Sequence, residues 1–309
     1  MSTAPILHHF EGSPFSEKMR AIFGAKRMAW RSVLVPLAIP KPDVTALTGG
    51  YRKTPILQIG ADIYCDTALI ARVIDELHPD PPLVPAGATM APFIAAWADA
   101  TLFWVAVMNT QAPEARAKIF QGLTPGEMQH LRDDRVAFTA AVRRPMPTDA
   151  AAQFQSALRS FEQALAGQPW LLGTEPSIAD FSVYHCVWFT ARAGLADVLL
   201  APFPAVRAWT ARIVALGHGQ REDITSSDAI AIAAAATQHA PVGVEADLGF
   251  DAGEPVTVGA IDYGPETVSG TLVGLTIERV TLARQDPRAG TVHVHVPFPR
   301  SGFQVQKAA

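Results

Sequence analysis

The stretch Ser-Pro-Phe-Ser-Glu-Lys-Met-Arg at residues 13–20 predicts the point where a strand turns into a helix. Ser13 stands where a helix N-cap belongs, and Pro14 occupies the first helical position, where its fixed φ suits the helix. A short apolar run over 6–10 supplies the preceding strand. The helix N-terminus attracts anions, although a well-capped helix without a ligand fits the same residues. The apolar residues that follow share one helical face: Phe15, Met19, Ile22 and Phe23.

The residues up to about 85 continue with further strands and a second helix. We predict a strand over 30–35 and a loop rich in Pro, Gly and Asp over 40–50. A hairpin follows over 55–65, and a helix begins at Asp66-Thr67 with Pro79 beyond its end. The order βαβ and then ββα is the layout of the thioredoxin fold.

Three motifs in this part resemble the N-terminal domain of a cytosolic glutathione transferase, and the resemblance covers residues 5–78. They are Gly12-Ser13-Pro14-Phe15, Lys53-Thr54-Pro55-Ile56-Leu57 and Cys65-Asp66-Thr67. The resemblance implies glutathione as co-substrate, and the sequence shows no ligand set from which a metal would be expected. The residues implied in binding it are Phe15, Lys53, Thr54, Pro55, Asp66 and Thr67.

The family pattern also implies a role for each motif in glutathione binding. The proline that matches Pro55 is cis in that family, and the backbone of the residue before it, Thr54 here, pairs with the cysteinyl part of glutathione. Asp66 and Thr67 would hold the γ-glutamyl end, Asp66 through the ligand's ammonium and Thr67 through its carboxylate. Arg52 and Lys53 are both candidates for the glycyl carboxylate, with Lys53 preferred, and a solvated surface charge is the alternative for either.

Ser13 is the candidate catalytic residue. It occupies the place of the cysteine in omega-type and glutaredoxin-like members of the resembled family. A hydroxyl cannot form a mixed disulfide, but it can donate a hydrogen bond to the glutathione sulfur and favour the thiolate. This indicates nucleophilic transfer and not thiol–disulfide exchange. Ser16, expected at the third helical position, is a second candidate.

The segment over 88–220 predicts an all-helical domain. Pro176-Ser177-Ile178-Ala179-Asp180 reads as a capping box, in which Ser177 and Asp180 serve structure. With the preceding Trp-Leu-Leu-Gly run at 170–173, it resembles the C-terminal domain of the same family. The resemblance implies that part of a helix over 90–110 lies over the glutathione site, as the wall of a pocket for an apolar co-substrate. The candidate residues of a co-substrate pocket are Phe10, Trp104 and Met108, each of which could instead be a core residue.

The remaining chain, 221–309, reads as a small, mainly β domain of no recognised family. An Ala-rich helix over 228–236 precedes alternating apolar patterns and regularly placed glycines, which predict an antiparallel sheet or barrel of four or five strands. We expect Val273, Leu275 and Ile277 to share one face. His293 and His295 would project from one face of a strand, but no neighbouring ligands complete a metal set.

The totals restrict the classes of partner. The chain has 309 residues and a net charge of -4, which favours neither nucleic acid nor acidic lipid as a partner. Its two cysteines, without metal-ligand spacing, fit a reducing cytoplasm. No apolar run approaches membrane-spanning length in this interpretation, so no membrane partner is expected.

The predicted fold is therefore a thioredoxin-like α/β domain over 1–80, a helical domain over 88–220 and a β-rich domain over 221–309. The predicted function is a glutathione-dependent transferase whose thiolate attacks a small, largely apolar electrophile. The alternative is a non-catalytic ligand-binding or protein-interaction module that uses the β-rich domain. The resemblance implies a homodimer in either case.

Overall fold

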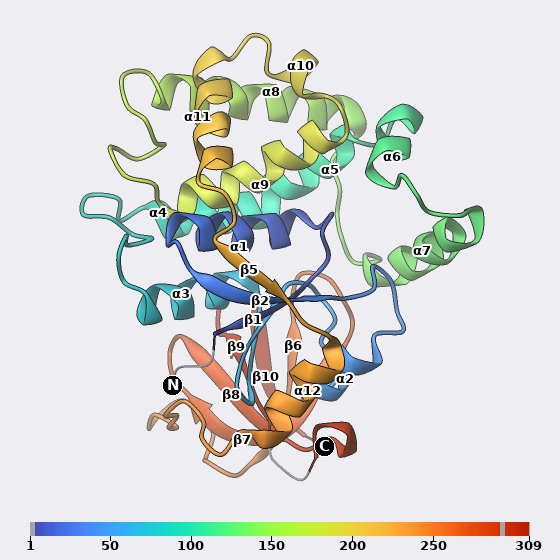
Figure 1. Cartoon of the computed structure of the whole chain (residues 1–309), viewed down its shortest axis with the longest axis vertical. Helices are drawn as coiled ribbons and strands as arrows, with labels where there is room; N and C mark the ends of the chain where they lie inside the picture. The colour runs from blue at the N-terminus through green and yellow to red at the C-terminus, as the bar shows by residue number, and fades with distance from the viewer. Residues whose placement is uncertain (1–3, 291–293, 309) are drawn as a thin grey trace.

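The computed structural model describes residues 4–290 and 294–308, and it arranges the chain in three parts along its longest axis. A helical part lies at one end, the thioredoxin-like part lies in the middle, and the C-terminal strands lie at the opposite end (Figure 1). The fold expected from the sequence is confirmed at this level. The boundary proposed at 220 stays a prediction.

The thioredoxin-like part has the order βαβαββα. Its strands are β1 (Ile6–His9), β2 (Ala29–Leu34), β3 (Ile56–Ile59) and β4 (Asp62–Cys65), and its helices are α1 (Pro14–Ala25), α2 (Pro42–Thr48) and α3 (Thr67–Leu77). Strand β1 pairs parallel to β2 and antiparallel to β3, which in turn pairs antiparallel to β4. The middle of the sheet thus carries both the Ser13 turn and the loop before β3.

Helix α2 corrects the sequence interpretation, which assigned 40–50 to a loop. Pro42 starts this helix and Gly49 ends it in the left-handed conformation, at φ 80°. Val44 and Leu47, three residues apart, are buried against the sheet. The proline and glycine residues at the two ends of this segment indicated a loop. The helix between them is stabilised by the burial of Val44 and Leu47 against the sheet.

The helical part begins with α4 (Ala91–Trp97), the π-helical segment η1 (Ala98–Leu102) and α5 (Phe103–Asn109). The Asp180 carboxylate accepts hydrogen bonds from the Ser177 N–H and hydroxyl, each at 2.8 Å, and from the Trp209 indole at 2.9 Å. The structural role expected for Ser177 and Asp180 is therefore confirmed. The other helices are α6 (Pro113–Ile119), α7 (Pro125–Phe138), α8 (Pro147–Ala164), α9 (Ile178–Arg192), α10 (Ala196–Leu199) and α11 (Pro204–Ala215).

The continuous helix Ala91–Asn109 has 19 residues with a mean hydropathy of 1.5, so by length and composition it could cross a membrane. This contradicts the expectation that no apolar run reaches that length. Ala98 and Leu102 are buried in the core of the helical part, and Asp99 forms an ion pair of 2.6 Å with the buried Lys18. These contacts bury the middle of the helix against the thioredoxin-like part, whereas 33% of its apolar window is buried in all.

The C-terminal segment extends the thioredoxin-like sheet at both edges. Strand β5 (Gln220–Asp223) pairs parallel to β2, and β9 (Val294–Pro299) meets β4, with Asp62 opposite His295. In the described residues the strand order is β10-β6-β7-β8-β9-β4-β3-β1-β2-β5. The added elements are α12 (Ser226–Ala235), β6 (Pro255–Ala260), β7 (Thr267–Leu275), β8 (Arg279–Arg284), η2 (Pro287–Ala289) and β10 (Phe303–Lys307).

One hydrophobic core joins this tail to the thioredoxin-like part. Ile56 and Ile63 of the first sheet lie in the same buried cluster as Leu282, Val296 and Phe298 of the tail. Helix α12 lies beside α2 on the same side (Figure 1). The antiparallel strands expected over the tail are present, but they are part of one larger sheet and not a separate sheet or barrel.

The apolar face expected in β7 is wrong in detail. A register shift between Leu272 and Gly274 changes the side to which the following residues point. Leu272 and Leu275 are therefore the fully buried residues, and Ile277 lies in the following turn with 76% of its surface exposed.

Candidate functional site

A cavity of about 870 Å³ opens between the thioredoxin-like part, the helical part and the tail. Of the predicted site residues, the structure brings together six on its wall: Phe10, Ser13, Phe15, Lys53, Thr54 and Trp104. Pro55 lies directly behind Thr54, and the peptide bond between them is cis, as the resemblance implied. Besides Pro55, four predicted residues are not among those that line the cavity: Ser16, Asp66, Thr67 and Met108.

Ser13 is positioned by the start of α1. Its backbone is extended, its N–H donates to the Phe10 carbonyl at 3.0 Å, and its Oγ accepts from the Ser16 N–H at 3.3 Å. Since the Oγ acts here as an acceptor, its own proton can be donated into the cavity. The hydroxyl is partly exposed at the positive end of α1. This arrangement suits a group that stabilises an anion.

Ser16 is placed differently from the sequence expectation. Its side chain is completely buried, and its Oγ has no hydrogen-bond partner among the described residues. It faces the protein interior behind the turn and contributes its backbone N–H to Ser13. The geometry therefore supports Ser13 and not Ser16 as the residue that meets a ligand.

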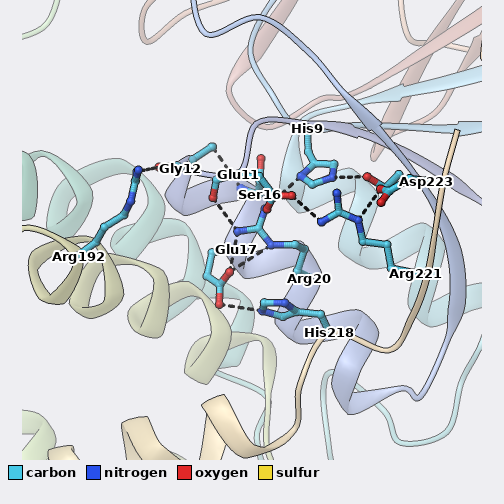
Figure 2. A network of polar contacts seen from close by, with 12 residues as sticks. His9, Glu11, Gly12, Ser16, Glu17, Arg20, Arg192, His218, Arg221 and Asp223 are labelled. Atoms are coloured by element: carbon cyan, nitrogen blue, oxygen red, sulfur yellow. Dashed lines mark hydrogen bonds and ion pairs between the residues drawn. The ribbon is translucent and has the colours of Figure 1, made fainter. Parts of the chain in front are cut away.

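A buried polar network holds the turn from behind (Figure 2). Arg20 donates to Glu17 at 2.7 Å, to the His9 ring at 3.1 Å and to the Glu11 carbonyl at 2.9 Å. Burial alone would raise the pKa of Glu17, but the hydrogen bond from His218 and the charge of Arg20 hold that pKa below its usual range. The network keeps α1 and the 9–12 segment in a fixed relative position.

Arg192 reaches the same turn from the helical part, as Figure 2 shows. Its guanidinium donates to the Gly12 carbonyl at 2.9 Å and to the Ile119 carbonyl at 3.1 Å. A Cβ at Gly12 would lie 2.1 Å from the Arg192 Nη1, so glycine is required for this approach. Arg192 thus connects the end of α9 to the residue before Ser13.

Asp66 and Thr67 form the start of α3 beside the cavity. Asp66 has a φ of 75° and its carboxylate caps the helix by accepting from the Ala68 N–H at 2.9 Å; burial raises its pKa. The Thr67 hydroxyl accepts from the buried Lys18 ammonium at 3.2 Å, and Lys18 is held by Asp99. The Thr67 proton stays available for donation to an anion.

Lys53 and Arg52 both form ion pairs with a loop of the tail, and Arg52 also pairs with α7. The Lys53 ammonium pairs with Asp262 at 2.6 Å and lies 3.8 Å from the centre of the Tyr263 ring. Arg52 pairs with Asp134 and with Glu266, each at 2.5 Å. The loop at 261–266 therefore orients two residues that the resemblance assigned to glutathione binding.

Tyr263 also closes the cavity wall. Its ring makes edge contacts with Trp104 and Phe138 at centroid distances of 5.4 and 5.3 Å. The Gly264 N–H donates to the Phe138 carbonyl at 3.0 Å, which fixes the loop to the end of α7. Sequence reasoning missed Tyr263 because its partners are far away in the chain.

Lys41 is a second residue that the sequence interpretation missed. It lines the cavity and is buried, with 7% of its surface exposed. Its ammonium lies 3.3 Å from the Arg52 carbonyl, and no carboxylate of the described residues pairs with it. Burial, and then the charges of Arg135 and Arg52, lower its pKa to about 8. A lysine between two prolines in a presumed loop gave no sign of this burial.

Asp62, His239 and His295 form a separate cluster at the junction of β4 and β9. His239 bonds to the Asp62 carboxylate at 2.6 Å, and the two imidazole rings stack 3.6 Å apart. One metal ion cannot lie in the planes of two parallel rings, so the geometry favours hydrogen bonding to Asp62. His293, named with His295 above, lies outside the described residues.

The pKa of Lys41 gives a direct test of this geometry. After reductive ¹³C-methylation, we expect one lysine methyl signal to titrate with a midpoint near pH 8, because the Lys41 amine is protonated below this pH and neutral above it. The same signal should be absent from the Lys41→Gln variant. Lys307 is the control, because its bond to Glu254 raises its pKa. A Lys41 signal that titrates near pH 10.4, the approximate value of a lysine in water, would contradict the burial.

Two family models match the chain, one over the thioredoxin-like part and one over the helical part. The family model described as glutathione S-transferase, N-terminal domain, matches residues 7–82, and the model described as glutathione S-transferase, C-terminal domain, matches residues 96–212. No curated protein matches the chain. The two models together cover the thioredoxin-like and helical parts and leave the tail outside.

Solved structures extend the likeness to the tail. A GST-like protein from Pseudomonas syringae is 39% identical, with both chains covered in full and a TM-score of 0.79. A glutathione S-transferase from Rhodospirillum rubrum F11 is 20% identical over 68% of this chain and 87% of that one, with a TM-score of 0.51, and shows the fold alone. The chain belongs to the glutathione S-transferase family.

Proposed function

We propose that the protein is a glutathione-dependent transferase in which Ser13 stabilises the thiolate of bound glutathione. The observation that carries this proposal is the Ser13 hydroxyl, which accepts from Ser16 and is partly exposed on the cavity at the start of α1. Its proton and the helix N-terminus both favour the anionic form of a nearby sulfur. The thiolate then attacks an electrophilic carbon, so that a C–S bond forms as the leaving group departs.

Glutathione recognition is proposed at both ends of the peptide. The Thr54 backbone would bind the cysteinyl part, and Asp66 would bind the γ-glutamyl ammonium, with Thr67 donating to the neighbouring carboxylate. For the glycyl carboxylate, Lys41 joins Lys53 as a candidate. Lys53 already pairs with Asp262, whereas Lys41 is a buried cation without such a partner among the described residues. An anionic ligand would offset the cost of burying it.

Phe15 would form the floor of the glutathione site. Its ring packs against Phe103 at 4.8 Å and against His185 at 4.7 Å, between centroids. These contacts hold the first turn of α1 against the helical part, so Ser13 keeps its orientation when the cavity is filled.

A homodimer in the cytoplasm is proposed as the setting of this activity. Met90, Phe93 and Trp97 lie at i, i+3 and i+7 around α4 and are 56%, 68% and 42% exposed, which supports a protein interface there. Cys65 and Cys186 are both buried free thiols, in keeping with a reducing compartment.

Light scattering should give about twice the chain mass of 33.0 kDa, and Phe93→Glu should reduce the measured mass to that of one chain. A mass of one chain for the unaltered protein would contradict the dimer.

Ser13→Ala tests the catalytic assignment. Without the hydroxyl, the pKa of the bound glutathione thiol should rise toward about 8.5. At pH 6.5, kcat/KM should then fall about tenfold or more, because each unit by which the thiol pKa rises above the pH lowers the thiolate fraction about tenfold. The glutathione Kd, measured by calorimetry, should stay within about twofold. The pH–rate profile with 1-chloro-2,4-dinitrobenzene is the readout.

Two outcomes would overturn this assignment. An unchanged profile in Ser13→Ala together with a shifted profile in Ser16→Ala would transfer the role to Ser16. Failure of the unaltered protein to bind glutathione at millimolar concentration would instead support the non-catalytic module as the function.

A further inference from the structure

The charges on the cavity wall have one sign. Among the described residues that line it, eight are lysines or arginines and none is an aspartate or glutamate. The chain as a whole has 25 basic and 29 acidic residues, so this separation is not a property of the composition. A cleft lined by charges of one sign concentrates ligands of the opposite sign.

Most of these cations lack a carboxylate partner. Arg52 and Lys53 are paired, as described above, but six others form no ion pair with any described residue. One of the six is Lys41, on the thioredoxin-like side. The other five come from the helical part, at α6, α7, the loop before α8 and the end of α9: Arg116, Arg132, Arg135, Arg144 and Arg192.

Arg135 and Arg144 each lie close to an aromatic ring of the cavity wall. The Arg135 guanidinium lies 5.4 Å from the centre of the Phe138 ring, and that of Arg144 lies 5.4 Å from the Trp104 ring. Tyr263 lies between these two rings. The side chain of Arg144 also donates to the Thr139 hydroxyl. The wall thus combines three aromatic rings, of which Tyr263 stands nearly perpendicular to the other two, with guanidinium groups close to them.

Glutathione does not account for this excess of positive charge. Its thiolate form carries three anionic groups and one ammonium, and the proposed partners Ser13, Thr67 and Lys41 already serve the anions. The arginines of α7 and of the loop before α8 are left without counter-charge. Burial lowers the pKa of Arg135, in keeping with a cation that is only partly hydrated. A bound anion would remove that electrostatic cost.

We propose that the co-substrate side of the cavity binds an aromatic electrophile that carries an oxyanion, a carboxylate or a sulfonate, held by Arg135 and Arg144. The ring would lie against Trp104, Phe138 and Tyr263. That the bound molecule is an electrophile rests on the proposed transferase function, whereas binding of an aromatic anion at this site does not require catalysis. It replaces the largely apolar substrate expected from the sequence with an amphipathic, anionic one.

The first test measures binding without glutathione. Two fluorescent probes differ by one sulfonate: 8-anilinonaphthalene-1-sulfonate and N-phenyl-1-naphthylamine. On the full chain, the sulfonate should bind at least about tenfold more tightly, as expected for charge-assisted hydrogen bonds. Arg135→Gln and Arg144→Gln should each remove about tenfold of the sulfonate affinity and leave that of the neutral probe within about twofold, which also shows that each variant is folded.

Arg143→Gln is the matched control. Arg143 is the neighbour of Arg144 on the same loop and is exposed like it, but it does not line the cavity. Equal affinity of the unaltered protein for the two probes would overturn the proposal. Loss of sulfonate binding in Arg143→Gln as large as in Arg144→Gln would also overturn it, because the effect would then be one of general surface charge.

The second test measures turnover with 4-chloro-3,5-dinitrobenzoate and 2-chloro-1,3-dinitrobenzene, which differ by one carboxylate. In both, the thiolate attacks the carbon that bears chlorine, a C–S bond forms and chloride leaves. Relative to the uncatalysed rates, kcat/KM should favour the benzoate about tenfold, and Arg144→Gln should abolish this preference. A benzoate disfavoured relative to its neutral analogue would overturn the proposal. If no glutathione binds, the transferase proposal fails, while the probe affinities still decide the anion site.

Discussion

The pairing of β9 with β4 is the contact on which the rest of this structure depends. The His295 N–H donates to the Ala61 carbonyl at 2.9 Å, and His295 lies opposite Asp62 in parallel register. This contact makes the tail strands a continuation of the thioredoxin-like sheet. Strand β5 pairs with β2 at the opposite edge, so the first strand of the tail, β5, and the last, β10, both belong to this sheet.

The continuous sheet brings a distant loop to the side of the cavity that is proposed to bind glutathione. Strands β6 and β7 carry the loop at 261–266 to α7 and to the segment before β3, where Asp262 and Glu266 neutralise Lys53 and Arg52. The tail therefore differs from an appended domain with a site of its own. It adjusts which cations of the cavity stay available for a ligand, and Lys41 is the one that it leaves unpaired on that side.

The features predicted correctly from the sequence depend on local physics. The Ser13 cap and the bond between Ser177 and Asp180 each involve residues three positions apart, so their side-chain types alone indicate them. The cis bond before Pro55 and the site motifs came from family resemblance. By contrast, the bond from Lys53 to Asp262 joins residues 209 positions apart, and the burial of Lys41 depends on a helix hidden between turn-forming residues. No local pattern could indicate either contact.

Native-state hydrogen exchange in Phe298→Ala tests the unity of the sheet most directly. Phe298 is 1% exposed and contacts Tyr51 of the first part and Phe303 of the tail. Its truncation should cost about 3–5 kcal/mol. If the sheet is one cooperative unit, amides of β3 and β4 should lose protection by the same factor, about a hundredfold or more, as amides of β6 to β8. Loss confined to the tail, with β3 and β4 unchanged, would contradict this account.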